Sequence, residues 1–150
     1  MNRTILVLNG PNLNLLGERE PDIYGFESLE DIRIASERCA KTHGLGVDFR
    51  QTNDESEIVS AIQNARATAN GIIINAAAYT HTSVAILDSL LACDIPIIEL
   101  HLSNVHKREE FRHHSFVARA ATGVICGFGA YGYELAVNAM AHLIAKADAS

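Results

Sequence analysis

Hydrophobic and polar positions alternate along the chain between two kinds of segment. Short segments rich in Ile, Leu and Val are apolar at nearly every position, which is typical of parallel strands buried on both faces of a sheet. Longer segments between them are amphipathic and favour helices. The predicted strands span residues 4–8, 47–51, 72–75, 96–100 and 123–127, and the predicted helices span 28–43, 54–69, 82–93 and 131–147.

Polar residues mark where two of these helices begin. Ser28 followed by Asp31 resembles a capping box, and Asp54 is suited to cap the second helix. Because strands and helices alternate, we expect an α/β fold with a parallel sheet and right-handed crossovers. Five strands in 150 residues predict a single domain over residues 1–150, with a flavodoxin-like, doubly wound sheet of strand order 2-1-3-4-5.

That strand order also predicts where a ligand binds. In a doubly wound sheet the crevice lies beyond the carboxyl ends of the strands, here between the first and the third. The segments 9–12, 75–81 and 101–104 follow three predicted strands and are rich in hydrogen-bonding side chains. One such loop would indicate only a turn, because Asn and Gly are common turn residues. Three at the same end of one sheet predict a site.

Composition and charge narrow the class of protein. Of the 150 residues, 48% are apolar and 20% are charged, as in a globular domain. The net charge of −6 argues against a nucleic-acid partner, although a few arginines can still form an anion-binding pocket. No apolar run is long enough to span a membrane, and the first one ends at Asn9, so we expect a cytoplasmic protein. The three widely spaced cysteines are expected to be reduced thiols.

The loop between residues 10 and 27 carries the first candidate chemistry. It is long for a connection between a strand and a helix, and glycines near its two ends bound a segment that holds Arg19 and Tyr24. Such a loop is either a lid that closes over a ligand or a solvated surface loop. Its position in the chain favours neither interpretation.

A second candidate lies at the end of the fourth predicted strand. Alternation along a strand places Glu99 and His101 on the same side. A carboxylate beside an imidazole fixes the tautomer of the ring and suits it to general-acid work, but structural Glu–His pairs also occur. Arg108 and Arg112 would share one face of a short helix over 108–113. They form either an anion clamp or a surface ion-pair face with neighbouring glutamates.

Asp88 stands in a predicted helix that is apolar on nearly every side. A helix of that kind is normally buried, and in so small a domain this indicates a subunit interface. A charge there needs a partner, which a neighbouring subunit would supply. The alternative is that Asp88 faces the only exposed strip of the helix.

Spacing excludes several kinds of site. The histidines do not follow metal-ligand spacing, and no HExxH motif occurs, so we expect no metal site. Asn9 and Asn75 stand where a phosphoacceptor receiver domain would carry acidic residues. The first turn is not the glycine-rich loop that binds nucleotide phosphates, and no GxSxG elbow is present.

Several short motifs follow one another along the chain. They are LNGPNLNLLG at 8–17 with Arg19 and Tyr24, NA followed by YTHTS within 75–83, ELHLSN at 99–104, REEFR at 108–112, and GFG with GY at 127–133. In this order they resemble the type II 3-dehydroquinate dehydratases. The resemblance covers almost the whole chain.

The resemblance implies an activity and a set of roles. The family dehydrates 3-dehydroquinate to 3-dehydroshikimate, in the shikimate pathway or in quinate breakdown, without a metal or a cofactor. It implies that Tyr24 is the base, that Arg19 activates it, that His101 is the acid, and that Asn12 holds a water near the developing enolate. It also implies a homododecamer built as a tetramer of trimers. The implied substrate-binding residues are Asn75, His81, Leu102, Ser103, Arg112 and Asp88, the last reaching the site of a neighbouring subunit.

Elementary chemistry agrees with this assignment. Loss of water from a β-hydroxy ketone needs a base, a stabilised enolate and an acid for the departing hydroxide. A guanidinium close to Tyr24 would favour the phenolate, and a Glu99–His101 pair would supply the acid.

Two alternative functions stay open from the residues themselves. One is a non-catalytic binding module for a polyhydroxylated acid, and the other is a metal-dependent hydrolase that uses the histidines of 101–114.

Overall fold

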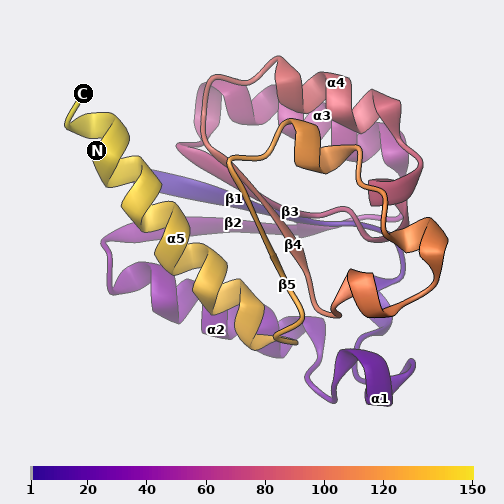
Figure 1. Cartoon of the computed structure of the whole chain (residues 1–150). Coiled ribbons are helices and arrows are strands. Elements are labelled where there is room, and N and C mark those ends of the chain that lie inside the picture. Colours follow the sequence, from indigo (N-terminus) through magenta and orange to yellow (C-terminus); the bar gives the residue numbers. More distant parts are fainter. Residues whose placement is uncertain (1) are drawn as a thin grey trace.

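The computed structural model describes residues 2–150 as a parallel sheet with helices on both faces (Figure 1). The strand order is β2-β1-β3-β4-β5, which confirms the predicted doubly wound topology. Every neighbouring pair of strands is parallel. The strands are β1 (Arg3–Asn9), β2 (Leu45–Gln51), β3 (Gly71–Asn75), β4 (Ile97–His101) and β5 (Gly123–Cys126).

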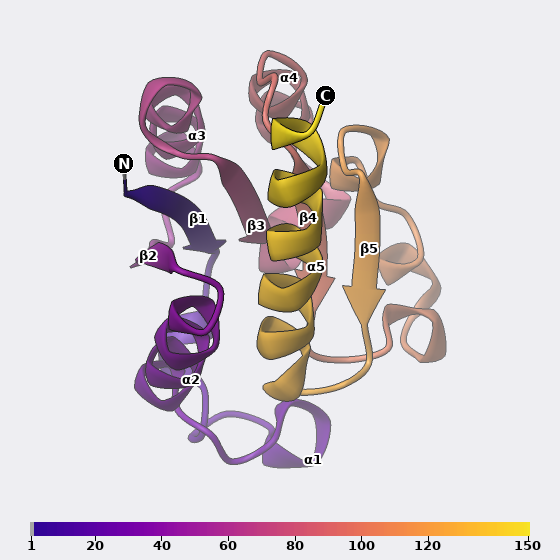
Figure 2. The same ribbon diagram turned by 90° about the vertical axis from the view of Figure 1, so that its left-hand side faces the viewer.

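The helices divide between the two faces of the sheet. Helices α2 (Leu29–Lys41) and α5 (Tyr131–Asp148) cover one face, whereas α3 (Glu55–Thr68) and α4 (Val84–Leu91) cover the other (Figures 1 and 2). Alternate residues of β1 enter the two cores: Ile5 packs with α2 and α5, and Leu6 packs with α3 and α4. The central strands β1, β3 and β4 are largely apolar because both of their faces are buried, whereas the edge strands β2 and β5 are partly exposed.

The predicted start signals of two helices are confirmed. The Ser28 hydroxyl accepts from the Asp31 backbone N–H at 3.1 Å, and the Asp31 carboxylate accepts from the Ser28 N–H at 3.0 Å. The Asp54 carboxylate accepts from the Ser56 N–H at 2.8 Å. Each bond satisfies a donor that the first turn of a helix leaves free.

The helix predicted over 108–113 is wrong. This segment contains only a single 3-10 turn, η4 (Glu110–Arg112), and another such turn, η3 (Val105–Lys107), precedes it. Arg108 separates them, and its backbone is extended, with φ −101° and ψ −168°. A residue in that conformation ends a helix, so the spacing of Arg108 and Arg112 does not place them on one helical face.

The segments that follow β1 and β3 lie close together at the carboxyl ends of these strands. The Gly10 N–H donates to the Asn75 carbonyl at 2.8 Å. A Cβ atom at position 10 would lie 2.5 Å from the Ala76 carbonyl oxygen, so only glycine fits there. This contact brings the loops after β1 and β3 to the same point, which is the switch point of the sheet.

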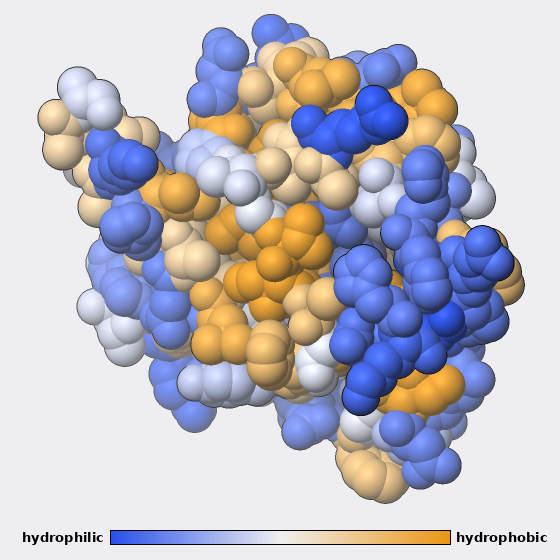
Figure 3. Space-filling view, viewed as in Figure 1, coloured by the Kyte–Doolittle hydropathy of each residue, from blue (hydrophilic) through white to orange (hydrophobic). Residues whose placement is uncertain are grey.

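Part of the protein surface is apolar. Figure 3 shows apolar surface over the edge strand β5, where Val124 is 51% exposed. Within residues 2–150, no helix is both long and apolar enough to cross a membrane.

Candidate active site

The loops that follow β1, β3 and β4 line one pocket together with the segment that carries Tyr24. This confirms that the three polar loops converge at the carboxyl ends of the strands. Most of the candidate residues face this pocket. They are Asn12, Arg19, Tyr24, Asn75, His81, His101, Leu102, Ser103 and Arg112.

Two candidate residues lie outside the lining. Glu99 is buried behind His101, at the far side of the ring from the pocket. Asp88 is exposed on α4, beside the exposed side chains of Val84 and Leu91. Within one chain, Asp88 therefore faces an exposed strip and contributes nothing to this pocket.

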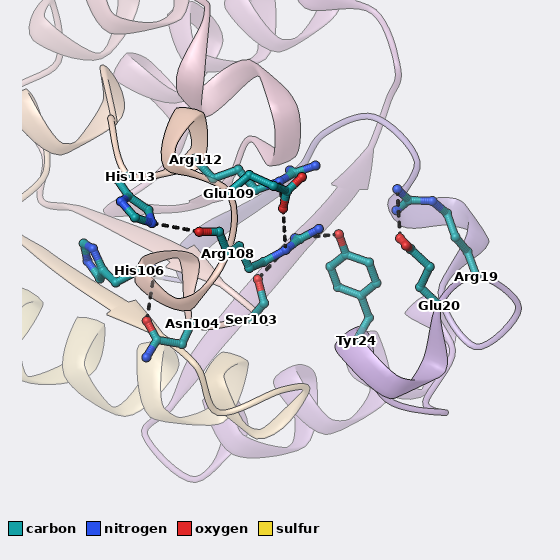
Figure 4. A network of polar contacts seen from close by, with 10 residues as sticks. All are labelled: Arg19, Glu20, Tyr24, Ser103, Asn104, His106, Arg108, Glu109, Arg112 and His113. Atoms are coloured by element: carbon teal, nitrogen blue, oxygen red, sulfur yellow. Dashed lines mark hydrogen bonds and ion pairs between the residues drawn. The ribbon is translucent and has the colours of Figure 1, made fainter.

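Tyr24 lies between two arginines (Figure 4). Arg108 Nη1 donates a hydrogen bond to the Tyr24 hydroxyl at 2.8 Å. The guanidinium carbon of Arg19 is 5.4 Å from the centre of the Tyr24 ring, and Arg19 pairs with the Glu20 carboxylate at 3.2 Å. The hydroxyl is therefore bonded by Arg108 and not by Arg19, the residue that the family resemblance implies as the activator of Tyr24. Two guanidiniums thus lie beside the Tyr24 side chain.

The sequence left open whether Arg108 and Arg112 form an anion clamp or a surface ion-pair face, and features of both arrangements are present. Both line the pocket, and both lie within ion-pair distance of Glu109, Arg112 at 3.1 Å and Arg108 at 3.7 Å. Their side chains are only 14% and 22% exposed, whereas that of Glu109 is 51% exposed. Glu109, the most exposed of the three, thus contacts both guanidiniums, and both arginines also line the pocket.

Glu99 and His101 form the expected pair. Nε2 of His101 lies 2.5 Å from a Glu99 carboxylate oxygen, and both side chains are buried. A carboxylate can only accept, so Nε2 is the donor in this bond. Nδ1 is then the ring nitrogen that remains for a group in the pocket.

His81 is arranged to accept a hydrogen bond from a ligand. Its Nδ1 donates to the His114 carbonyl at 2.7 Å, so Nε2 carries the free lone pair. Burial lowers the pKa of His81, and the hydrogen bond to the His114 carbonyl offsets only part of this effect. The ring of His81 is therefore neutral at pH 7. The His114 carbonyl fixes its orientation by accepting the hydrogen bond from Nδ1.

A buried hydrogen-bonded chain fixes Asn75. The Asn75 amide donates to the Tyr133 hydroxyl at 3.0 Å, and that hydroxyl donates to Asn9 Oδ1 at 2.7 Å. The Asn9 amide in turn donates to the Arg50 carbonyl at 3.0 Å. Burial raises the pKa of Tyr133 well above its ordinary value, so the hydroxyl keeps its proton.

The amino-acid sequence matches a family model described as Dehydroquinase class II over residues 3–141. The chain belongs to the class II dehydroquinase family. It is 57% identical over 143 residues to the 3-dehydroquinate dehydratase of Methylobacterium radiotolerans, and the match covers 95% of this chain and 96% of that protein.

Solved dehydroquinase structures agree with this membership. The type II dehydroquinase of Propionibacterium acnes superposes with a TM-score of 0.89 at 44% identity, covering 95% of this chain and 98% of that one. The type II dehydroquinase of Butyrivibrio crossotus superposes with a TM-score of 0.90 at 43% identity, covering 93% and 97%. The family resemblance that the motifs indicate is confirmed.

Two other features of this dehydroquinase-family site are its possible metal ligands and the backbone geometry of Asn12. Among residues 2–150, no three side chains of His, Cys, Asp or Glu gather closely enough to hold a metal ion. Asn12 adopts the left-handed conformation, with φ 70°, and its N–H donates to Asn53 Oδ1 at 3.0 Å. That turn presents Asn12 to the pocket.

Sequence reasoning considered Arg108 only as a possible anion clamp with Arg112 and missed its bond to Tyr24, and it missed the bond between Tyr133 and Asn9. The signal for Arg108 was present, because it lies in the REEFR motif, four residues before Arg112. Tyr133 and Asn9 also lie in the quoted motifs, but no local pattern pairs a tyrosine in an amphipathic helix with an asparagine at a strand end.

Replacing the buried tyrosine tests the chain that fixes Asn75. Tyr133→Phe leaves Asn9 without its donor and Asn75 without its acceptor. We expect the free energy of unfolding to fall by about 1–3 kcal/mol, the usual cost of an unsatisfied buried polar group. Chemical denaturation measures this, with Tyr131→Phe at a 58% exposed position as the control. Equal stability of the two variants would contradict the importance of the buried chain.

Proposed function

We propose that this chain catalyses the dehydration of 3-dehydroquinate to 3-dehydroshikimate, a step of the shikimate pathway, by acid and base catalysis through an enolate. Family membership supports the reaction. The observation that carries the chemistry is that one pocket holds both an arginine-bonded Tyr24 and a carboxylate-bonded His101. A binding module would need neither arrangement.

Tyr24 is the base in this proposal. Arg108 bonds its hydroxyl directly, and Arg19 lies against its ring, so both stabilise the negative charge that the base must carry. The phenolate removes the proton beside the substrate ketone, and the electrons move into the enolate. A water held by Asn12 stabilises the enolate oxygen by hydrogen bonding.

His101 is the acid. Glu99 accepts from Nε2 and stabilises the imidazolium, and Nδ1 gives its proton to the departing hydroxide. The elimination therefore yields a conjugated enone and water. The other pocket residues bind the substrate in this proposal. They are Asn75 and neutral His81 for hydroxyl groups, Arg112 for the carboxylate, and the backbone of Leu102 and Ser103.

An absorbance assay tests the proposal. We expect purified protein mixed with 3-dehydroquinate to raise the ultraviolet absorbance of the conjugated enone product. Because all proposed groups are side chains or backbone of this chain, a chelator should leave the rate unchanged. A chelator-sensitive rate would favour the metal-dependent alternative, and no product from folded protein would favour the binding module.

Replacing each of the two arginines separately by lysine tests which one activates Tyr24. We expect Arg108→Lys to lower kcat by about 10- to 100-fold, because a charge-assisted hydrogen bond to the hydroxyl is lost or misaligned. Arg19→Lys should lower kcat by less, because Arg19 makes no hydrogen bond to that hydroxyl. The exposed Arg66→Lys on α3 is the control. A larger loss in Arg19→Lys would reverse this ranking.

We also propose that copies of this single-domain chain, spanning residues 1–150, assemble into a dodecamer as a tetramer of trimers in the cytoplasm. Exposed Val84 and Leu91 flank Asp88 on α4, which suits a subunit interface that carries Asp88 toward a neighbouring site. The three free cysteines suit a reducing compartment. Light scattering of the purified protein measures the assembly.

A further inference from the structure

Ser115 contacts the buried carboxylate behind the proposed acid. Its hydroxyl lies 2.9 Å from each of the two Glu99 carboxylate oxygens. Within residues 2–150, the only other hydrogen-bond partner of that carboxylate is His101, and no lysine or arginine forms an ion pair with it. A buried carboxylate is costly unless donors surround it, so the Ser115 hydroxyl supplies a substantial part of what Glu99 needs.

The direction of this hydrogen bond is fixed by the backbone. The Ala118 N–H donates to the Ser115 hydroxyl oxygen at 3.0 Å and so occupies one of its lone pairs. A hydroxyl has one proton, and the nearest acceptor for it is the Glu99 carboxylate. Ser115 and His101 therefore both donate to Glu99, from different sides.

The segment that carries Ser115 is attached to the loop after β3. The Phe116 N–H donates to the Thr80 carbonyl at 2.9 Å. On the other side of Ser115, the His114 carbonyl accepts from His81 at 2.7 Å. The position of the hydroxyl is thus set by the fixed part of the site and is independent of the segment that carries Tyr24.

We propose that Ser115 is a positioning residue for the acid, which holds the Glu99 carboxylate so that His101 keeps Nε2 bonded and presents Nδ1 to the substrate. This inference rests on the proposed role of His101. Ser115 does not line the substrate pocket. It lines a second cavity of about 220 Å³ on the other side of His101, and acts only through Glu99.

Substitution of Ser115 tests the proposal. We expect Ser115→Ala to lower kcat by about 10- to 100-fold with KM within about twofold, the loss typical of one hydrogen bond to a charged group. Ser115→Thr keeps the hydroxyl, so it should restore most of the turnover. Ser60→Ala removes the same hydroxyl at an exposed position on α3 and is the matched control. If Ser115→Ala does not fold, Ser115→Cys, with its weak thiol donor, takes its place with the same expectation.

Isotope exchange separates a role in positioning the acid from a merely structural role. In D2O, removal of the substrate proton by Tyr24 introduces deuterium into recovered substrate, and this step does not need the acid. We expect Ser115→Ala to retain exchange while product formation slows, so that exchange per product rises about tenfold, in proportion to the lost hydrogen bond. An equal loss of exchange and product formation, or full turnover, would overturn the proposal.

The proposed function and this inference fail differently. Full turnover in His101→Gln would remove the acid role and the inference with it. A strongly impaired His101→Gln together with a fully active Ser115→Ala would overturn the inference alone.

Discussion

Replacing Tyr24 by Phe should abolish most turnover while leaving substrate binding nearly normal. A positioned general base contributes about 10²- to 10⁴-fold to a rate, and the substitution removes only its oxygen. The ring remains between Arg19 and Arg108, so the shape of the pocket is kept. We therefore expect kcat to fall by about 10²- to 10⁴-fold with little change in substrate affinity.

The measurement for Tyr24→Phe combines two experiments. The absorbance of the enone product gives kcat, and calorimetric titration of the inactive variant with substrate gives its affinity. Tyr131→Phe, at an exposed position on α5, is the matched control and should behave as the parent protein. Parent-like turnover in Tyr24→Phe would remove this residue as the base, and lost affinity would assign it to binding.

Replacing His101 by Gln should have an effect of similar size for a different reason. The glutamine amide is a neutral donor, so it can bond Glu99 but cannot deliver a proton to a departing hydroxide. We expect kcat to fall by about 10²- to 10⁴-fold, whereas thermal stability stays near that of the parent protein. His101→Ala should instead lose stability as well, because it leaves the buried Glu99 carboxylate without that partner.

A change of leaving group identifies the acid role of His101. A substrate analogue whose leaving group departs without a proton should regain turnover in His101→Gln, because the acid is then unnecessary. His142→Gln, exposed on α5, is the control for the substitution itself. Equal impairment with both substrates would show that His101 does not act by protonating the leaving group.

Much of the fold was predictable from local patterns. The central strands were found because a strand buried on both faces is apolar at nearly every position, and the alternation of strands and helices fixed the parallel order. The Ser28 capping box was readable because its two residues are three apart. The segment over 108–113 was mispredicted because its charge spacing fits a helix, whereas the extended backbone of Arg108 interrupts it.

Some contacts of the candidate site were likewise predictable from local patterns, and others were not. Glu99 and His101 are two residues apart on one strand, so alternation alone placed them together. Arg108 and Tyr24 are 84 residues apart, and their contact depends on how two loops pack at the end of the sheet. The same is true of Ser115, whose contact with Glu99 requires the chain to return to β4 after leaving it.

By itself, the sequence determined the doubly wound sheet, the end of it that carries the site, and the pair that can act as an acid. Each of these follows from residues that are close along the chain, where periodicity fixes direction. The tertiary structure decided that Arg108 and not Arg19 bonds the Tyr24 hydroxyl. It also decided that Tyr133 meets Asn9 across 124 residues. Such contacts depend on the packing of distant segments, which no local pattern encodes.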